Sequence, residues 1–272
     1  MKPKNDEIGT RMKKYEAMAC PDRLMPLLPV IARLDGRSFH SLTRGLEKPF
    51  DERFISLMQE TAKYLIEETN APIAYVQSDE ISLLWHEPEY KSQIFFDGRI
   101  QKMVSTLAAM ASVKFNQLLP KFLPEKARKS PTFDCRVFTV PNKEEVHNAF
   151  LWRIEDAERN SIQAVGQVNF SHKQMQGLNN RQVLEKLKEE KNFDWESFPE
   201  HLRYGTMFRK ETEERQFTTE EIDKLPAKHE ARSNPELTVQ RSVIRRVNDL
   251  KYFKSCYNWS FVLFCQQAID KR

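Results

Sequence analysis

Two strand-like apolar runs that meet acidic residues constrain the fold of this chain more than any other feature. Residues 28–34 are typical of a mostly buried strand, which an Asp-Gly pair brings to an end. Residues 73–85 hold two apolar runs on either side of 78–80, which predicts a tight hairpin with carboxylates at its tip. If these strands pair, Asp35 and Asp79 lie side by side at one edge of a sheet.

The segments around these runs add two helices and a fourth strand. Asp51 is the expected N-cap of a helix over 52–69, whose apolar residues recur on one face. A second long helix is predicted over 98–118, and a further strand over 132–140. The resulting order is the split βαββαβ pattern, which predicts an antiparallel sheet with two helices on one face.

The rest of the chain predicts a largely helical portion that packs on this core. The other expected elements are an N-terminal helix over 5–19, helices over 143–170 and 180–190, and strands over 237–247 and 257–265. The charged stretch 210–236 has no strong period and reads as a loop or hairpin excursion whose role is open. We divide the chain into a core over 1–141 and a C-terminal portion over 142–272, packed together as one continuous domain.

Charge and cysteine content narrow the broad class of the protein. The 43 Lys and Arg residues against 39 Asp and Glu give a net charge of +4, which suits a local basic face or an ordinary solvated surface equally well. The four cysteines form no CxxC pair and no close Cys/His cluster, which argues against a zinc site and indicates a reducing, intracellular setting.

Targeting and phosphate-binding signals are also informative. The first residues lack a secretory apolar core, and no apolar run reaches membrane-spanning length, so we expect a cytoplasmic protein with no membrane partner. The seven glycines are well separated and form neither a P-loop nor a Rossmann turn. Metal ions and arginines would therefore have to hold any bound phosphate.

Asp35 and Asp79 are the predicted bridging ligands of divalent metal ions that carry a nucleoside triphosphate. Magnesium prefers oxygen ligands and keeps several waters, so one or two carboxylates plus phosphate oxygens suffice. Two ions about 3.5–4 Å apart stabilise both the attacking and the leaving oxygens in phosphoryl transfer. The carbonyl of Gly36 is close enough in sequence to contribute, whereas Glu80 points to the opposite strand face unless a turn redirects it. Each feature alone is more often a plain turn or a solvated tip, and only their combination carries the prediction.

Basic residues near these carboxylates are candidates for binding the triphosphate. Arg33, Lys102 and Arg136 are expected to neutralise it. Arg99, Lys102 and Ser105 recur at three-residue spacing on the first turns of a predicted helix. Positive side chains at a helix start are disfavoured by the helix dipole unless they meet an anion. A solvated basic face is the alternative interpretation.

The segment that follows the first carboxylate carries further candidates. Arg37 and His40 lie close to it in sequence and suit a phosphorylated ligand, although a lone histidine is more often structural or on the surface. Ser38 is a candidate for a backbone amide contact and Phe39 for a stacking surface.

Four stretches of this sequence resemble the tRNA-His guanylyltransferase family: ARLDGRSFH, QSDEISLLW, FDCRVF and the WRxxDA segment. The likeness covers about residues 28–210. It implies an α+β fold with a polymerase-palm-like (ferredoxin-like βαββαβ) core and a helical C-terminal half. It also implies nucleotide addition to the 5′ end of tRNA in the 3′-to-5′ direction, with two Mg²⁺ ions and with ATP, GTP and other NTPs as substrates.

The resemblance further implies roles for individual residues, in catalysis, metal binding and nucleotide binding. The catalytic and metal positions match Asp35, Gly36, Asp79, Glu80 and Lys48, of which Lys48 corresponds to a lysine used in 5′ activation. The nucleotide contacts match residues 35–40, Ser78, Asp79 and Asn160. The phosphate-binding positions match Arg33, Arg99, Lys102, Ser105 and Arg136.

The stretch after WRxxD departs from the HINN motif of the eukaryotic enzymes, because in residues 158–161 only Asn160 matches. This resembles the branch of Thg1-like proteins, which favour templated repair of 5′-truncated tRNA and form tetramers. Guanylate addition to tRNA-His is then the alternative. In the implied reaction, ATP or GTP activates a 5′-monophosphorylated RNA and releases pyrophosphate. The 3′-hydroxyl of an incoming NTP then attacks the activated phosphate and displaces AMP.

The basic residues of the late strand 237–247 are candidates for RNA binding. Arg241, Arg245 and Arg246 would contact phosphates, with a salt-bridged strand face as the alternative. Two functions of other classes also stay open. A palm-domain nucleotide cyclase would share the two carboxylates but need no tRNA, and a non-catalytic RNA-binding protein would have kept only the fold.

Overall fold

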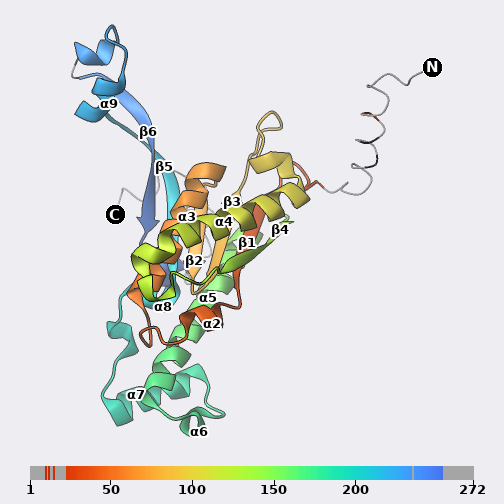
Figure 1. Cartoon of the computed structure of the whole chain (residues 1–272). Coiled ribbons are helices and arrows are strands. Elements are labelled where there is room, and N and C mark those ends of the chain that lie inside the picture. Colours follow the sequence, from red (N-terminus) through yellow and green to blue (C-terminus); the bar gives the residue numbers. More distant parts are fainter. Residues whose placement is uncertain (1–9, 11, 13–14, 16–22, 235, 254–272) are drawn as a thin grey trace.

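The computed structural model in Figure 1 describes residues 23–234 and 236–253, together with positions 10, 12 and 15. The expected strand over 257–265 and most of the expected helix over 5–19 lie outside these residues. The strands are β1 (Val30–Arg37), β2 (Ile73–Gln77), β3 (Glu80–Trp85), β4 (Thr132–Thr139), β5 (Thr206–Gln216) and β6 (Thr238–Val247). The helices are α2 (Phe39–Thr43), α3 (Glu52–Thr69), α4 (Ile100–Phe122), α5 (Lys143–Asn169), α6 (His172–Met175), α7 (Asn180–Lys191), α8 (Glu200–Tyr204), α9 (Thr219–Lys224) and α10 (Leu250–Phe253).

The strands form one antiparallel sheet in the order β4-β1-β3-β2-β5-β6. Its first four strands, with α3 and α4, are the predicted βαββαβ unit. The alternation of side chains along each strand separates two cores. Val30, Ala32 and Leu34 pack against α3 and α4, whereas Ile31 packs on the other face with α5. The predicted fold class is confirmed, and β5 and β6 extend the sheet beyond β2.

The first strand differs from its prediction because the Asp-Gly pair lies inside it. Asp35 and Gly36 are paired on the β4 side, and Asp35 also pairs with Glu80 of β3, so the chain does not turn here. Gly36 instead makes room for a ring, since a Cβ at this position would lie 2.4 Å from the Phe39 side chain. Phe39 begins the short helix α2, which was not among the elements predicted from the sequence.

Local capping explains why the long helices begin where they do. The Asp51 side chain accepts from the amides of Arg53 at 3.0 Å and Phe54 at 3.3 Å, as predicted for the N-cap of α3. Asn70 ends α3 in the left-handed conformation with φ 55°. Helix α4 starts two residues later than expected and continues to residue 122, after a short 3₁₀ turn, η1 (Phe95–Gly98).

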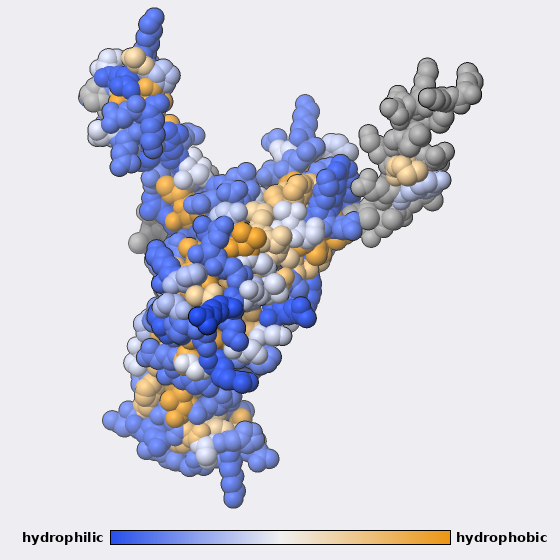
Figure 2. All heavy atoms as spheres, viewed as in Figure 1, coloured by the Kyte–Doolittle hydropathy of each residue, from blue (hydrophilic) through white to orange (hydrophobic). Residues whose placement is uncertain are grey.

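β5 and β6 form a long hairpin arm that projects from the body and carries α9 near its tip (Figure 1). The predicted excursion over 210–236 is thus a hairpin, in which β5 continues to Gln216. Figure 2 shows the surface of the arm as mostly hydrophilic, with isolated apolar atoms. Among the residues that the structure describes, no helix has the length and apolar character to cross a membrane.

Candidate active site

The carboxylates of Asp35 and Asp79 meet at the end of the sheet where β2 turns into β3. The amide of Gly36 donates to the carbonyl of Asp79 at 3.0 Å, which ties this turn to β1. Burial raises the pKa of Asp79, and the neighbouring Asp35 carboxylate raises it further. The structure therefore brings the two carboxylates together as predicted, and their role as metal ligands stays a prediction.

Glu80 lies directly across from Asp35 on β3, on the same face of the sheet. Its two oxygens accept from the guanidinium of Arg153, from Nε at 2.7 Å and from Nη2 at 2.9 Å. Arg33 lies 3.9 Å from the same carboxylate. Burial raises the pKa of Glu80, although the Arg153 charge opposes this effect. A buried carboxylate engaged by two arginines fits a positioning contact better than the catalytic role expected of Glu80.

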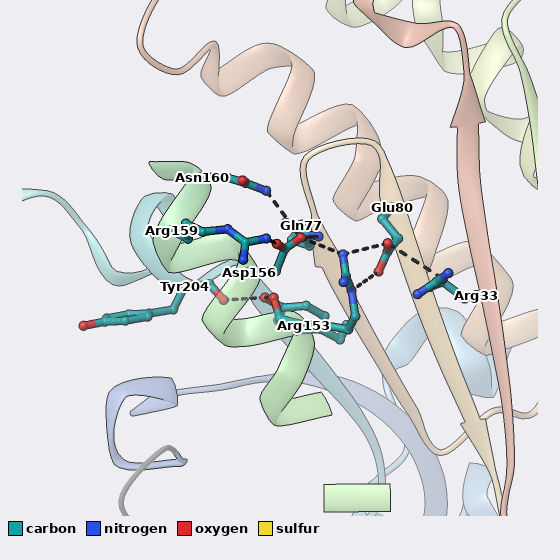
Figure 3. Close-up of polar contacts among 9 residues, drawn as sticks. Arg33, Gln77, Glu80, Arg153, Asp156, Arg159, Asn160 and Tyr204 are labelled. Atoms are coloured by element: carbon teal, nitrogen blue, oxygen red, sulfur yellow. Dashed lines mark hydrogen bonds and ion pairs between the residues drawn. The ribbon is translucent and has the colours of Figure 1, made fainter. Parts of the chain in front are cut away.

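Asp156 on α5 connects this ion pair to other polar residues (Figure 3). Its Oδ2 accepts from Arg153 Nη2 at 2.9 Å, and Arg159 pairs with its Oδ1. The amides of Gln77 and Asn160 donate to the same Oδ2 at 3.5 and 3.4 Å. Residues three and four apart share a helix face, so α5 presents Arg153, Asp156 and Asn160 together. One carboxylate thus fixes the relative positions of the strand end and this helix face.

A cavity of about 330 Å³ opens beside the acidic turn. It brings together Lys48 from the loop before α3, Ser78 from the turn and Asn160 from α5. Apolar residues form much of the remaining wall, among them Phe50, Phe54, Met58, Val76, Ala157 and Val168. An apolar pocket of this size with a few polar groups suits a small organic ligand. Lys48, predicted to act in 5′ activation, and the predicted nucleotide contacts Ser78 and Asn160 therefore line one cavity although they come from distant parts of the chain.

Arg33 and Arg136 face each other across β1 and β4, on the same sheet face as Asp35. The Arg136 side chain is 59% exposed and lies 3.8 Å from Asp134. The Arg33 guanidinium lies 5.3 Å from the ring centroid of Trp152. Both predicted phosphate-binding arginines therefore lie close to the acidic pair and on its open side.

The segment after β1 contributes surface groups but no stacking ring. Arg37, Ser38 and His40 are exposed, as their predicted contacts with a nucleotide require. Phe39, in contrast, is only 2% exposed and packs against the rings of its aromatic neighbours Phe54, Phe115 and Phe133. The predicted stacking role of Phe39 is therefore wrong, because its ring fills the core.

The predicted phosphate-binding residues on the first turns of α4 lie at the opposite end of the sheet. These residues are Arg99, Lys102 and Ser105. A backbone bridge joins Arg23 to Arg99 where the chain approaches β1. β1 begins at Val30, at this end of the sheet, and Asp35 lies five residues further along the strand, a distance of about 16 Å. Contrary to the prediction, this group does not join the acidic pair within one chain.

Comparison with known proteins identifies the family and supports the fold. The family model described as tRNAHis guanylyltransferase (Thg1) matches residues 9–141. A solved bacterial tRNA(His) guanylyltransferase (Thg1)-like protein in complex with ATP is 41% identical to this chain, with a TM-score of 0.69. The match covers 75% of this chain and 87% of that one. This chain belongs to the Thg1 family.

Other known proteins are also similar to this chain. A bacterial Thg1-like protein in complex with GTP is 30% identical with a TM-score of 0.69, over 94% of this chain and 99% of that one. The uncharacterized protein R259 of Acanthamoeba polyphaga mimivirus is 31% identical over 76% of this chain and 78% of its own length. The tRNA(His) guanylyltransferase of Schizosaccharomyces pombe is 32% identical, and this chain spans only 56% of its length.

The acidic pair of this Thg1-family chain fits a divalent metal ion. In the described part of the chain, neither Asp35 nor Asp79 has an arginine or lysine ion pair, and Arg33 lies beside Glu80 instead. Two carboxylates that repel each other without a compensating cation favour a bound cation. The described residues hold no cluster of three metal-binding side chains, so phosphate and water oxygens would complete the ligand set, as magnesium allows.

The basic residues of the arm are largely neutralised within the arm itself. Arg241 lies 2.9 Å from Glu221, and Arg245 lies 3.3 Å from Glu211. Arg246 donates to the hydroxyl of Thr206 at 3.2 Å. The alternative of a salt-bridged strand face therefore describes Arg241 and Arg245, and their contact with RNA stays a prediction.

Sequence reasoning missed three residues of this site. Gln77, Arg153 and Asp156 form the network beside Glu80, yet none was assigned a role. The signal was present in the WRxxDA segment, where Arg and Asp stand three apart as they must to share a helix face. The partner across the fold, Glu80, could not be read from that spacing.

Proposed function

We propose that this Thg1-family protein adds nucleotides to the 5′ end of tRNA in the 3′-to-5′ direction, and that it repairs 5′-truncated tRNA by templated addition. The observation that carries this proposal is the placement of the paired carboxylates, Asp35 and Asp79, next to a nucleotide-sized cavity. The bacterial Thg1-like proteins that this chain resembles were solved with ATP and with GTP, which supports a nucleoside triphosphate in the cavity.

The chain's own residues divide the work between binding and orientation. Lys48 and Asn160 would hold the triphosphate in the cavity through charge-assisted hydrogen bonds. Arg33 and Arg136 would bind phosphates on the open side of the site. The Asp35 carboxylate and its partner at the turn would hold Mg²⁺, which supplies stabilisation of the charge that develops on phosphoryl oxygens.

The reaction consists of two phosphoryl transfers that these residues orient. In the first, the 5′ phosphate of the RNA attacks the α-phosphorus of ATP or GTP, and pyrophosphate leaves. In the second, the 3′-hydroxyl of the incoming NTP attacks the activated 5′ phosphate, loses its proton, and displaces AMP or GMP. The geometry supports catalysis mainly by placing the reacting groups and neutralising their charge.

Templated repair is preferred over guanylate addition to tRNA-His because of the residues that follow WRxxD. Only Asn160 of the HINN motif is present, and Asn160 donates to Asp156 and lines the cavity. The similar fungal guanylyltransferases are matched over little more than half of their length, which gives their specific activity less weight here. A homotetramer and a cytoplasmic location are further parts of this proposal.

The test offers 5′-truncated, 5′-monophosphorylated tRNAs of several identities to the purified chain, with ATP and each labelled NTP in turn. We expect the added nucleotide to be the one that pairs with the opposite 3′ strand. Addition of guanylate to tRNA-His alone, regardless of the opposite base, would favour the alternative.

Two controls separate this function from its rivals. Labelled NTPs without RNA should give no cyclic product, because the cyclase alternative predicts one. Asp79→Asn should abolish addition, since full activity of this variant would remove the metal assignment. RNA binding without nucleotide addition would support the alternative of a non-catalytic RNA-binding protein.

A further inference from the structure

Strands β1 and β4 carry three paired rows of side chains on the sheet face that packs against α5. Every second residue of a strand points to the same face, and each row pairs a residue of β1 with its partner on β4. In order toward the acidic pair, the rows are Ile31 with Phe138, Arg33 with Arg136, and Asp35 with Asp134. The face therefore changes from apolar to basic to acidic in steps of about 7 Å.

The indole of Trp152 lies beside the first two rows and is largely uncovered. Trp152 is 56% exposed and shares a small hollow with Ile31, Arg33 and Phe138. Phe138 itself is 39% exposed. Within the described part of the chain, β4 is an edge strand of the sheet, so these two aromatic rings face the solvent side by side with the basic row.

The fold does not depend on the Trp152 ring for its core. Phe150 and Ile154, which flank it on α5, are buried against the sheet. Trp152 falls between them in sequence and is 56% exposed on the helix surface. Trp152 and Phe138 are exposed together in one hollow, and apolar side chains that gather on a surface mark interaction sites more often than single ones do.

Two arginines flank this indole and are themselves fixed in position. The guanidinium of Arg33 lies 5.3 Å and that of Arg153 lies 4.6 Å from the ring centroid of Trp152. Both arginines also face Glu80, at 3.9 Å for Arg33 and 2.7 Å for Arg153. The ring is therefore part of a preorganised surface of paired basic and acidic side chains next to Asp35.

We propose that Trp152 is a stacking platform for a nucleobase near the 5′ end of the RNA, while Arg33 and Arg136 bind the adjoining phosphates. This inference rests on the proposed function, because it assumes that the polymer end must reach Asp35. Single-stranded ends of nucleic acids are commonly held by exposed aromatic rings beside basic side chains. The row spacing is comparable with the separation between phosphate and base within one nucleotide.

The topology favours RNA over a second protein copy on this surface. The cavity lies on the β2 side of the acidic pair and takes the free nucleotide, which leaves the β4 side for the polymer end. Protein–protein interface cores are depleted of charged residues, whereas here the aromatic pair adjoins a basic row and an acidic row.

The experiment measures binding of a 5′-monophosphorylated RNA hairpin with a recessed 5′ end to the full chain by fluorescence anisotropy, without NTP. Trp152→Ala should weaken binding about tenfold, and Trp152→Phe, which keeps an aromatic face, should stay within about threefold of the wild type. Tyr90→Ala is the matched control, because Tyr90 is 80% exposed and lies in the loop after β3. It should bind RNA as the wild type does, and ATP affinity should be unchanged in all variants.

Unchanged RNA affinity in a folded Trp152→Ala variant would overturn the inference. So would a loss of RNA binding that accompanies a change of oligomeric state in sedimentation, since that result assigns the surface to a second copy. Because the readout is binding, the two proposals fail separately. A wild type that adds nothing but needs Trp152 to bind RNA contradicts only the proposed function, whereas normal addition with normal RNA affinity in the variant contradicts only this inference.

Discussion

The two sides of the acidic pair differ in how much of a ligand they enclose. On the β2 side, helices α3 and α5 and the loop before α3 surround a cavity of about 330 Å³. On the β4 side, the sheet formed by the described residues ends at an edge strand, and Arg136 and Trp152 are more than half exposed. A concave pocket surrounds much of a small molecule, whereas an open surface admits the end of a long one. The difference indicates that one pair of carboxylates serves a free nucleotide and a polymer from opposite sides.

The largest expected effect comes from the group that both sides share. Asp79→Asn should lower the single-turnover rate of nucleotide addition about a thousandfold, because charge stabilisation at phosphoryl oxygens depends on the paired carboxylates. Affinities for ATP and for the RNA hairpin, measured without metal, should stay within about threefold. Asp223→Asn, on the hydrophilic arm, is the charge-matched control. A rate within tenfold of the wild type would contradict the interpretation that one carboxylate pair serves both the nucleotide and the polymer.

The network around Asp156 links the two sides, so its loss should affect both. Asp156→Ala removes the acceptor that holds Arg153 and Asn160, at 2.9 and 3.4 Å. We expect kcat to fall about ten- to a hundredfold, in line with about 1.5–3 kcal/mol for hydrogen bonds to a charged group. The KM values should change far less, since Asp156 acts through other residues.

A conservative variant separates positioning from general destabilisation. Asp156→Asn keeps an oxygen that can accept from Arg153 and should recover part of the lost kcat. If Asp156→Ala and Asp156→Asn differ from the wild type only in Tm, with kcat unchanged, the residue has a structural role alone.

A substitution that alters only the cavity should have a smaller effect, and this effect should concern nucleotide binding and not RNA binding. Asn160→Ala should raise KM for the nucleotide about tenfold, the loss expected for one hydrogen bond to a charged phosphate, and leave RNA affinity unchanged. Asn148→Ala on the same helix is the matched control, because Asn148 is exposed and its side chain donates to Glu145, one turn away. Weaker RNA binding by Asn160→Ala would show that the two sides are not separate.

The sequence predicted those parts of this arrangement that local patterns determine. The alternation of apolar residues and the turn between two short strands were enough to place Asp35 beside Asp79. The position of the α4 group around Arg99 was predicted incorrectly, because a helix pattern does not tell which end of a sheet the helix begins at. Trp152 and Asp156 were missed as site residues, since the face that α5 turns to the sheet depends on packing between distant segments.

The smallest expected effect concerns the stability of the fold. It tests whether the paired carboxylates destabilise the protein when no cation is bound to them. Burial and the Asp35 carboxylate raise the pKa of Asp79 above its ordinary value of 3.8, so the folded protein holds this proton more tightly than the unfolded chain does. At pH below 3.8 both states are protonated and the site has no electrostatic penalty. As the pH rises through the unfolded and then the folded pKa, stability falls, and the loss persists at neutral pH.

Asp79→Asn removes that penalty and should raise the Tm at neutral pH in the presence of EDTA, with a difference from the wild type that shrinks as the pH falls toward 3.8. Added Mg²⁺ should raise the Tm of the wild type and have little effect on the variant, because a ligand that binds only the folded state stabilises it. An equal response of both proteins to Mg²⁺ would mean that the cation binds elsewhere. In that case no metal ion would lie between the two carboxylates. The separation of a free nucleotide on the cavity side from a polymer on the open side would then depend on the shapes of the two surfaces alone.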